Sequence, residues 1–486
     1  MSRFIHWPRW RRFIVGGSAA AGHWRLLAAV SLVAGSLAAL AVAGLLYFSP
    51  VRSAVAPPPY PHELTQVRFA VAGDVIPHDA VRAAAAAHGP GEQGWAALLN
   101  DVAGVFRSAD FGFVNLETPV APDHSHGTKP FMFNAPLALP QALKASGIRI
   151  VSFANNHVMD QGWAGFAETL GHLRQIGLLF AGTGDTAQDA WQPVITQANG
   201  ITVGWLGMTR WLNGNRNPDT PGQPHVNFFP YPGESSGAPG ASEDEVLAAI
   251  RAARAKCDFL VVSIHWGIEY ASAPRSQDVE LAHKMLDAGA SVIVGHHPHV
   301  LQPIETYHTA DGRNTIIFYS LGNFLSNQSR TYIDGLMPDR EGDPRDALIA
   351  LFSAVKMDYG PAGTRVELGH VGILPVWGVN NRNQIARGKA SAPDIHPVLI
   401  DREIPLLQAQ LDALTRAAGQ NLADSSAPPA SGVPGTPPAP PEVLTPAQKQ
   451  QFIEITTRLK LLTDRRAQIL ARVGGEFLIE PPPAGH

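Results

Sequence analysis

The sequence predicts an α/β fold for the bulk of the chain, preceded by one N-terminal transmembrane helix. Short apolar runs rich in β-branched and aromatic residues alternate with helix-like stretches between Val67 and Asp401, as expected for buried strands of an α/β architecture. Hydrophobic residues make up 45% of the 486 residues and charged residues 16%, which is enough apolar material for a large core. The segment 26–48 is apolar and uncharged, and about 20 such residues span a bilayer.

The N-terminal segments predict a single-pass protein of the cell membrane. Residues 1–25 form a basic segment with several arginines, and the apolar segment 26–48 follows. Because positive charge marks the cytoplasmic side, the remainder of the chain is expected to be extracytoplasmic. The alternative is a cleaved signal peptide, since Ala54-Val55-Ala56 resembles a cleavage site.

Composition divides the rest of the chain into further parts. Thr445 and Pro446 are typical of a helix start, and apolar residues recur behind them at helical spacing. We expect this last helix either to pack on the body or to bind a partner. The predicted parts are a Pro-rich spacer (49–66), the main α/β domain (67–401), a helical extension (402–426), a Pro/Ala-rich linker (427–444), and a C-terminal amphipathic helix and tail (445–486).

Polar side chains stand at the end of most predicted strands, which are 67–72, 111–115, 148–153, 201–206, 259–264, 291–294 and 315–319. In α/β sheets, ligands collect outside the carboxyl ends of the strands. Imidazole nitrogen and carboxylate oxygen are ligands of first-row divalent cations. The pattern therefore predicts one or two divalent metal ions at this edge, with Mn, Fe, Zn, Mg and Ca not distinguished.

Each of these residues also has a structural explanation. Asp74 could cap a turn, His157 could be a hydrogen-bonded core histidine, and ligand and structural roles are equally open for His265. The segment from His296 to His299 is the most specific, because three histidines within four residues exceed what packing needs.

Charge and cysteine content exclude several classes of protein. A net charge of −4 leaves no basic surplus for a phosphate backbone, which argues against a nucleic-acid partner. Cys257 is the one cysteine, so neither an intrachain disulfide framework nor a thiolate zinc cluster is available.

Together the motifs resemble the CapA, or poly-γ-glutamate capsule synthesis, family, which is similar to the calcineurin-like metallophosphoesterases. The resemblance implies a four-layer sandwich of two mixed β-sheets flanked by helices, with a metal centre at one edge. The motifs that carry it are Ala72-Gly73-Asp74-Val75-Ile76, Val114-Asn115-Leu116-Glu117, Phe131-Met132-Phe133-Asn134, the segment from Ala154 to Gly162, Ser263-Ile264-His265-Trp266-Gly267, Gly295-His296-His297-Pro298-His299 and the segment from Tyr319 to Phe324.

The same resemblance assigns roles to particular residues. His157 would stabilise developing charge or protonate the leaving group. Asp160 would orient its imidazole, because an imidazole in this role usually needs such a partner. Ile76 stands where the family pattern has a second ligand in Asp-x-His, and His78 is a candidate substitute. The implied metal ligands are Asp74, Glu117, Asn156, His265, His297 and His299.

These features predict a metal-dependent hydrolase or transferase acting on an anionic cell-envelope polymer or its precursor. The membrane and other capsule-synthesis membrane subunits are the expected partners. The alternative is a non-catalytic accessory subunit that keeps the fold as a polymer-binding or export platform. Isomerisation by proton abstraction at a metal-polarised carbonyl also stays open. The long stretch 210–240, rich in Asn, Pro and Gly, is predicted to be a loop over the site.

Overall fold

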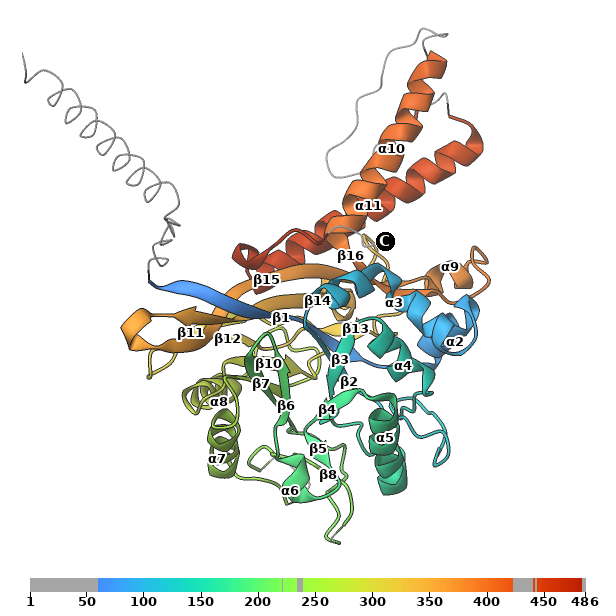
Figure 1. Ribbon diagram of the computed structural model, residues 1–486. Coiled ribbons are helices and arrows are strands. Elements are labelled where there is room, and N and C mark those ends of the chain that lie inside the picture. Colours follow the sequence, from blue (N-terminus) through green and yellow to red (C-terminus); the bar gives the residue numbers. More distant parts are fainter. Residues whose placement is uncertain (1–59, 221, 234–238, 423–439, 442–443, 483–486) are drawn as a thin grey trace, which may run out of the picture. The chain divides into compact units, whose positions relative to one another are not determined.

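The computed structural model describes residues 60–220, 222–233, 239–422, 440–441 and 444–482 (Figure 1). The predicted segments 1–25 and 26–48 lie outside these ranges, as does most of the predicted linker 427–444. Within the described ranges, none of the helices combines the length and apolar character that a membrane crossing requires.

The first sheet is mixed and has eight strands, in the order β16-β15-β14-β1-β2-β3-β4, with β13 also paired to β1. β1 through β4 run parallel to one another, and β14 to β16 are added antiparallel. The strands are β1 (His62–Val75), β2 (Phe111–Leu116), β3 (Ile148–Ser152), β4 (Leu179–Ala181), β13 (Asn323–Leu325), β14 (Asp346–Asp358), β15 (Thr364–Asn380) and β16 (Ile395–Leu399).

The second sheet is also mixed and has six strands, in the order β11-β12-β10-β9-β7-β6. Its four central strands are parallel, and β6 and β11 are antiparallel edges. The strands are β6 (Val194–Ala198), β7 (Ile201–Thr209), β9 (Phe259–His265), β10 (Val292–His296), β11 (Ile304–His308) and β12 (Asn314–Phe318); a separate small pair joins β5 (Thr183–Gly184) to β8 (His225–Val226).

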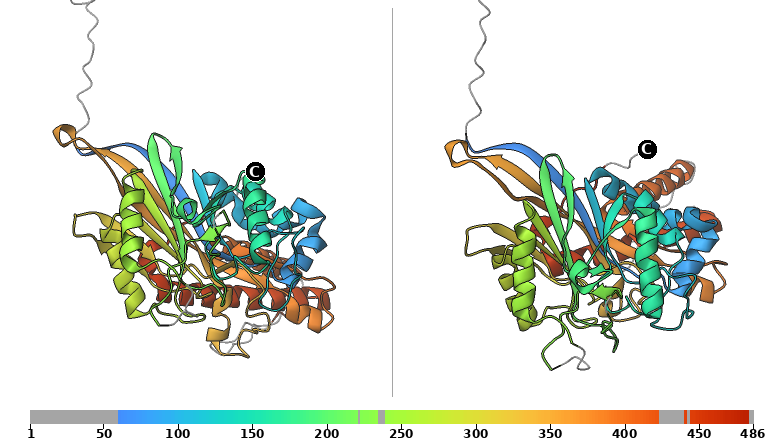
Figure 2. Two further views of the ribbon diagram at one scale, coloured as in Figure 1. Left: turned by 90° about the horizontal axis from the view of Figure 1, so that it is seen from below. Right: turned by 60° about the horizontal axis from the view of Figure 1, so that its bottom comes forward.

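Helices cover the outer face of each sheet (Figures 1 and 2). One apolar cluster joins the helices α2 to α5 to the first sheet, a second fills the space between the sheets, and a third joins α7 and α8 to the second sheet. The predicted mixed sheets flanked by helices are therefore present. The helices are α2 (Asp79–His88), α3 (Gly91–Ser108), α4 (Ala138–Ala145), α5 (Gly162–Ile176), α6 (Ala187–Ala190), α7 (Glu243–Arg254), α8 (Ser276–Asp287) and α9 (Arg382–Ala386).

The C-terminal helices α10 (Ile400–Leu422) and α11 (Pro446–Val473) belong to the same body. Thr445 caps α11, with its hydroxyl accepting from the N–H of Gln448, as the sequence predicted. Leu462 and Ile469 of α11 join the cluster that lies between the sheets. The side chain of Arg465 is fully buried and contacts Asp343 and Asp346. The sequence left open whether this helix packs on the body or binds a partner, and the structure shows α11 packed on the body.

The strands differ from prediction mainly at their ends. β1 begins at His62 rather than Val67, because residues 62–66 pair with the far end of β14. Apart from the exposed Leu64, these residues are polar, and all five are at least partly exposed, so they lack the apolar pattern that marks a buried strand. The predicted spacer 49–66 therefore runs into the sheet.

Candidate metal centre

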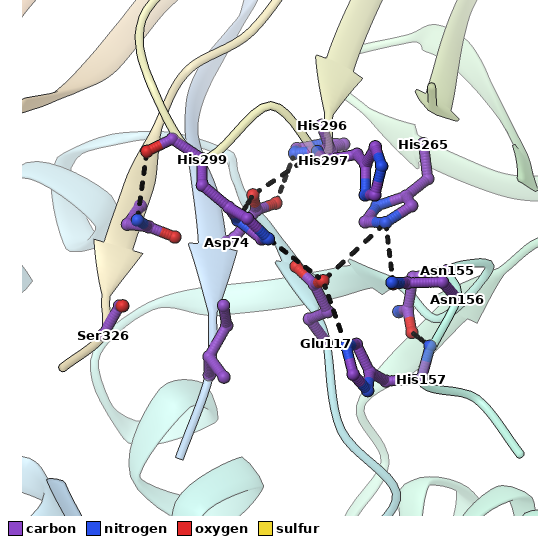
Figure 3. A network of polar contacts seen from close by, with 12 residues as sticks. Asp74, Glu117, Asn155, Asn156, His157, His265, His296, His297, His299 and Ser326 are labelled. Atoms are coloured by element: carbon purple, nitrogen blue, oxygen red, sulfur yellow. Dashed lines mark hydrogen bonds and ion pairs between the residues drawn. The ribbon is translucent and has the colours of Figure 1, made fainter. Parts of the chain in front are cut away.

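The parallel strands of both sheets end at one edge, and the predicted site residues meet there (Figure 3). Asp74 lies near the end of β1, Glu117 follows β2, and Asn156 and His157 follow β3. The second sheet contributes His265 at the end of β9. His296 ends β10, and His297 and His299 follow in the next turn.

Asp74 is fully buried and held by several polar groups. Its Oδ1 accepts from Asn115 Nδ2 at 2.9 Å, and His299 Nδ1 lies 3.1 Å from its Oδ2. His296 Nδ1 lies 3.3 Å from Oδ1. The backbone before Asp74 packs so closely on β13 that a Cβ at Gly73 would lie 1.8 Å from the carbonyl oxygen of Gly322. This close approach fixes β1 against the backbone of Gly322, and the contacts with His296 and His299 place the carboxylate between the two sheets.

Glu117 is fully buried, and its Oε1 has no hydrogen-bond partner among the described residues. The Nε2 atoms of three imidazoles surround this oxygen, those of His265 at 3.7 Å, His299 at 3.8 Å and His157 at 4.0 Å. These separations are too long for hydrogen bonds. An unpaired buried carboxylate oxygen is costly, so the arrangement calls for a positive charge.

The spacing of these atoms fits a shared cation. Two ligands that each lie about 2.0–2.2 Å from one ion are roughly 3–4 Å apart for ordinary coordination angles. Two groups in the described part of the chain have ligand atoms within 4.8 Å of one another, namely Glu117 with His297 and His299, and Asp74 with Glu117 and His265. Both groups contain Glu117, and all their members are buried. They could hold a metal ion.

The turn that carries His297 and His299 has an unusual backbone. The φ angles are +96° at His297 and +58° at His299, values that residues with side chains rarely adopt. The ring of His297 lies 4.7 Å from that of His265, between ring centroids. Strained backbone of this kind occurs where the surrounding structure fixes a functional group.

Asn156 and His265 contact each other directly. His265 Nε2 lies 2.9 Å from Asn156 Oδ1, and Asn156 Nδ2 donates to Asn213 Oδ1 at 3.2 Å. Asn213 belongs to the long stretch 210–240, whose described residues include the short strand β8. This stretch therefore reaches the cluster, as the sequence predicted.

His157 and Asp160 form a separate pair at the border of the cluster. His157 Nδ1 donates to Asp160 Oδ2 at 2.8 Å, and the same oxygen accepts from the N–H of Phe133 at 2.6 Å. The ring of Phe133 packs on the imidazole, with centroids 4.5 Å apart. These contacts fix the ring so that its Nε2 faces Glu117.

Burial shifts the pKa values of the central groups in opposite directions. Burial, together with the charge of Asp74, raises the pKa of Glu117 well above its ordinary value. Burial also raises the pKa of Asp74, but contacts with His296 and His299 outweigh it, so this pKa lies well below its ordinary value. For His265, burial and the neighbouring His297 lower the pKa. For His297, burial and His299 lower it to about 3. Neutral imidazoles are the form that binds metal.

Three further residues take part for which no role was predicted from the sequence. The amide of Asn115 contacts Asp74, Glu117 and His265. Asn155 Oδ1 accepts from the N–H of His157 at 3.1 Å. His296 is buried and its Nδ1 contacts Asp74, but neither ring nitrogen has a hydrogen bond of good geometry among the described residues. Strand alternation was the available signal for His296, because it shares the inward face of β10 with Val292 and Val294.

His78 does not belong to either group of candidate ligands. Its Nδ1 accepts from the N–H of Asn327 at 3.2 Å, and its ring packs on Phe133 with centroids 5.1 Å apart. His78 therefore supports the loop beside the cluster.

The fold and the buried cluster define a class: an α/β protein with two mixed sheets and a candidate metal centre where their parallel strands end. Within this class, the chain belongs to a particular family, the bacterial capsule synthesis proteins PGA_cap, whose model matches residues 68–328. The resemblance to the CapA family is thereby confirmed.

Individual relatives agree with this assignment. The PGA biosynthesis protein CapA of Bacillus subtilis is 34% identical over 49% of this chain and 59% of its own length. The capsule biosynthesis protein CapA of Bacillus anthracis is 31% identical over 48% of this chain and 54% of its own length. A probable polyglutamine synthesis accessory protein of Mycobacterium tuberculosis is 27% identical over 45% of this chain and 56% of its own. The chain thus spans little more than half the length of these curated relatives.

Likeness to solved structures is weak. A putative 5′-nucleotidase from Staphylococcus aureus, solved with α-ketoglutarate, gives a TM-score of 0.35 and 13% identity over 64% of this chain and 54% of that chain. A likeness at this level bears on neither the site nor the activity.

Proposed function

We propose that the chain is a metal-dependent hydrolase or transferase that acts on an anionic cell-envelope polymer, or its precursor, during capsule synthesis. Membership of the capsule synthesis family supports the biological setting. The buried carboxylates and imidazoles support the chemistry. The proposal includes an N-terminal membrane anchor and an extracytoplasmic site, which rest on the apolar segment 26–48 and the arginines before it.

The observation that carries the proposal is the unpaired Oε1 of Glu117. A purely structural glutamate at this depth would be hydrogen-bonded, because burial of an unpaired carboxylate costs several kcal/mol. Three imidazole nitrogens face this atom at distances between 3.7 and 4.0 Å. A divalent cation held by Glu117 together with His265 or His299 would satisfy the unpaired oxygen and leave His157 Nε2 free.

We assign the metal ligands from this geometry and from the family motifs. Asp74, Glu117, Asn156, His265, His297 and His299 would hold one or two ions, with Glu117 shared between the two groups. When bound, such an ion lowers the pKa of a coordinated water toward about 7 and polarises the scissile bond.

His157 would carry out the proton transfer or charge stabilisation. Its Nδ1–H is committed to Asp160, so Nε2 is the atom that exchanges a proton with the substrate or stabilises charge on it. Asp160 keeps the proton on Nδ1 and holds the ring plane. The surrounding burial excludes bulk water from this atom, because the His157 side chain is only 8% exposed.

Substitution of His157 tests the catalytic proposal. The full chain loaded with Mn, Fe, Zn or Ca should cleave a phosphoester or γ-glutamyl model substrate. His157→Ala should abolish turnover while the metal content stays unchanged. Absence of turnover with every metal, in a chain that binds metal, would contradict the enzymatic proposal.

The second candidate function is that of a non-catalytic accessory subunit in a polymer synthesis or export complex. A relative described as a synthesis accessory protein favours it. In that case His157→Ala would leave capsule formation intact in cells, whereas an enzyme would lose it.

A further inference from the structure

We propose that Asn323 is a positioning residue that holds the strained His297–His299 turn in the geometry that metal binding requires. This inference rests on the proposed metal centre. Asn323 begins β13, and its Cα pairs with that of Asp74 in the parallel ladder between β13 and β1. The amide is buried and lies directly beside the cluster without belonging to either group of candidate ligands.

The turn needs external support because its backbone is unfavourable. Both His297 and His299 have positive φ angles, and such residues persist only where neighbouring groups fix them. Backbone N–H groups hold two carbonyls of this segment: Trp266 donates to His296 O at 3.0 Å, and Tyr270 donates to Pro298 O at 2.7 Å.

Asn323 supplies the corresponding support for His299. Its Nδ2 donates to the carbonyl oxygen of His299 at 3.1 Å. The same nitrogen lies 2.9 Å from the carbonyl oxygen of Pro344 and 3.0 Å from Gln328 Oε1. One planar amide thus ties the turn to the segment before β14. The orientation of the His299 imidazole toward Asp74 and Glu117 depends on this backbone.

Side-chain chemistry explains why an amide is suited to this place. An amide nitrogen carries two protons, whereas an ionised carboxylate has none and a hydroxyl has one. The acceptors around Nδ2 are all oxygen atoms, so the assignment of this atom as the donor follows from its neighbours.

Asn227 offers a matched control. It is fully buried, its Nδ2 donates to the carbonyl oxygens of Ala190 at 2.7 Å and Gly207 at 2.8 Å, and its Oδ1, like that of Asn323, has no partner among the described residues. Its side-chain bonds reach none of the candidate ligands. Loss of this amide is a structural perturbation without a direct link to the cluster.

The test uses Co²⁺ as the probe, because its visible absorption bands report the number and arrangement of its ligands. The full chain is compared with Asn323→Leu, Asn323→Asp and Asn227→Leu, all at pH 7.5. For each protein, a Co²⁺ titration gives Kd and the band shape, and denaturant unfolding without metal gives stability. We expect both Asn323 variants to raise Kd about 10- to 100-fold and to change the bands, as loss of outer-sphere partners does.

Asn227→Leu should lose stability while its Kd and bands stay unchanged. The Asn323 proposal would be overturned if the folded Asn323 variants bind Co²⁺ as the parent does, or if Asn227→Leu alters binding equally. Should Asn323→Leu not fold, the isosteric Asn323→Asp decides. A parent chain that binds no Co²⁺ would overturn the metal centre as well, so the two failures are distinguishable.

Discussion

Asp160 holds the imidazole of His157 by the contact on which the proposed proton transfer depends. Asp160→Asn keeps the shape but removes the negative acceptor, so the imidazole loses its fixed tautomer. We expect turnover of a cleaved model substrate to fall about 10- to 100-fold, with metal content unchanged. Asp185, an exposed partner of Arg174, is the control, and Asp185→Asn should leave turnover unaltered. Equal turnover in both variants would remove Asp160 from the mechanism.

The lowered pKa of His78 predicts that the metal-free protein loses stability in acid. Burial, with smaller contributions from His299, His157 and Arg330, lowers its pKa to about 4, although its contact with Ile76 O acts in the opposite direction. Between pH 6.5 and about 4 the unfolded chain therefore takes up this proton more readily than the folded chain. The free energy of unfolding should fall as pH falls through this window, by up to about 3 kcal/mol from this residue.

Comparison with His78→Gln isolates this contribution, because glutamine does not titrate and can still accept from Asn327. Denaturant unfolding of the chelator-treated proteins at pH 7 and pH 4.5 measures it. The loss of stability on acidification should be smaller in the variant, and an identical loss would contradict the assignment.

The position of Asp74 depends on the close contact between β1 and the start of β13. An added methyl in Gly73→Ala would collide with the backbone of Gly322, which cannot yield as a flexible side chain can. We expect a loss of more than about 3 kcal/mol in the free energy of unfolding and weaker metal binding. Gly104 in α3 has open space around its Cβ position, so Gly104→Ala should stabilise by about 0.5–1 kcal/mol. Urea unfolding of Gly73→Ala and Gly104→Ala measures both changes in the free energy of unfolding.

Besides its apolar contacts, the helix α11 is held to the body by the buried cation of Arg465. Arg465 contacts Asp343 and Asp346, and Arg465→Met would leave Asp346 buried without its main partner. We expect a loss of about 3–5 kcal/mol on urea unfolding. Arg458 on the same helix pairs with Glu403 while its side chain is 40% exposed, so Arg458→Met should cost less than about 1 kcal/mol. Similar losses of stability in the two variants would show that the buried ion pairs of Arg465 stabilise the fold no more than the exposed pair of Arg458 does.

At the scale of the whole molecule, the sequence predicted the α/β class and the strands that carry the cluster, because buried strands are nearly continuous apolar runs. The strand that begins at residue 259 was predicted to end at residue 264, and in the structure it ends at His265. The start of β1 was less predictable, since residues 62–66 gain their order from pairing with β14, which lies far along the chain.

The gathering of Asp74, Glu117 and the histidines was also predicted, because each lies at or just after the end of a strand and these strands end at a common edge. Strand alternation could have indicated His296, whereas the contributions of Asn115 and Asn323 could not be read from the sequence. They depend on which strands are neighbours and on the register between them, such as the pairing of Asp74 with Asn323.

Cation binding by the buried cluster underlies both the proposed chemistry and the proposed role of Asn323, and metal content tests it most directly. The full chain and Glu117→Gln would be purified without chelators, and bound metals counted by elemental mass spectrometry. We predict one to two divalent ions per parent chain and a clear reduction in Glu117→Gln, with both proteins folded. A parent chain without metal that also fails to take up Mn, Fe, Zn or Ca, or a variant with unchanged content, would contradict the account.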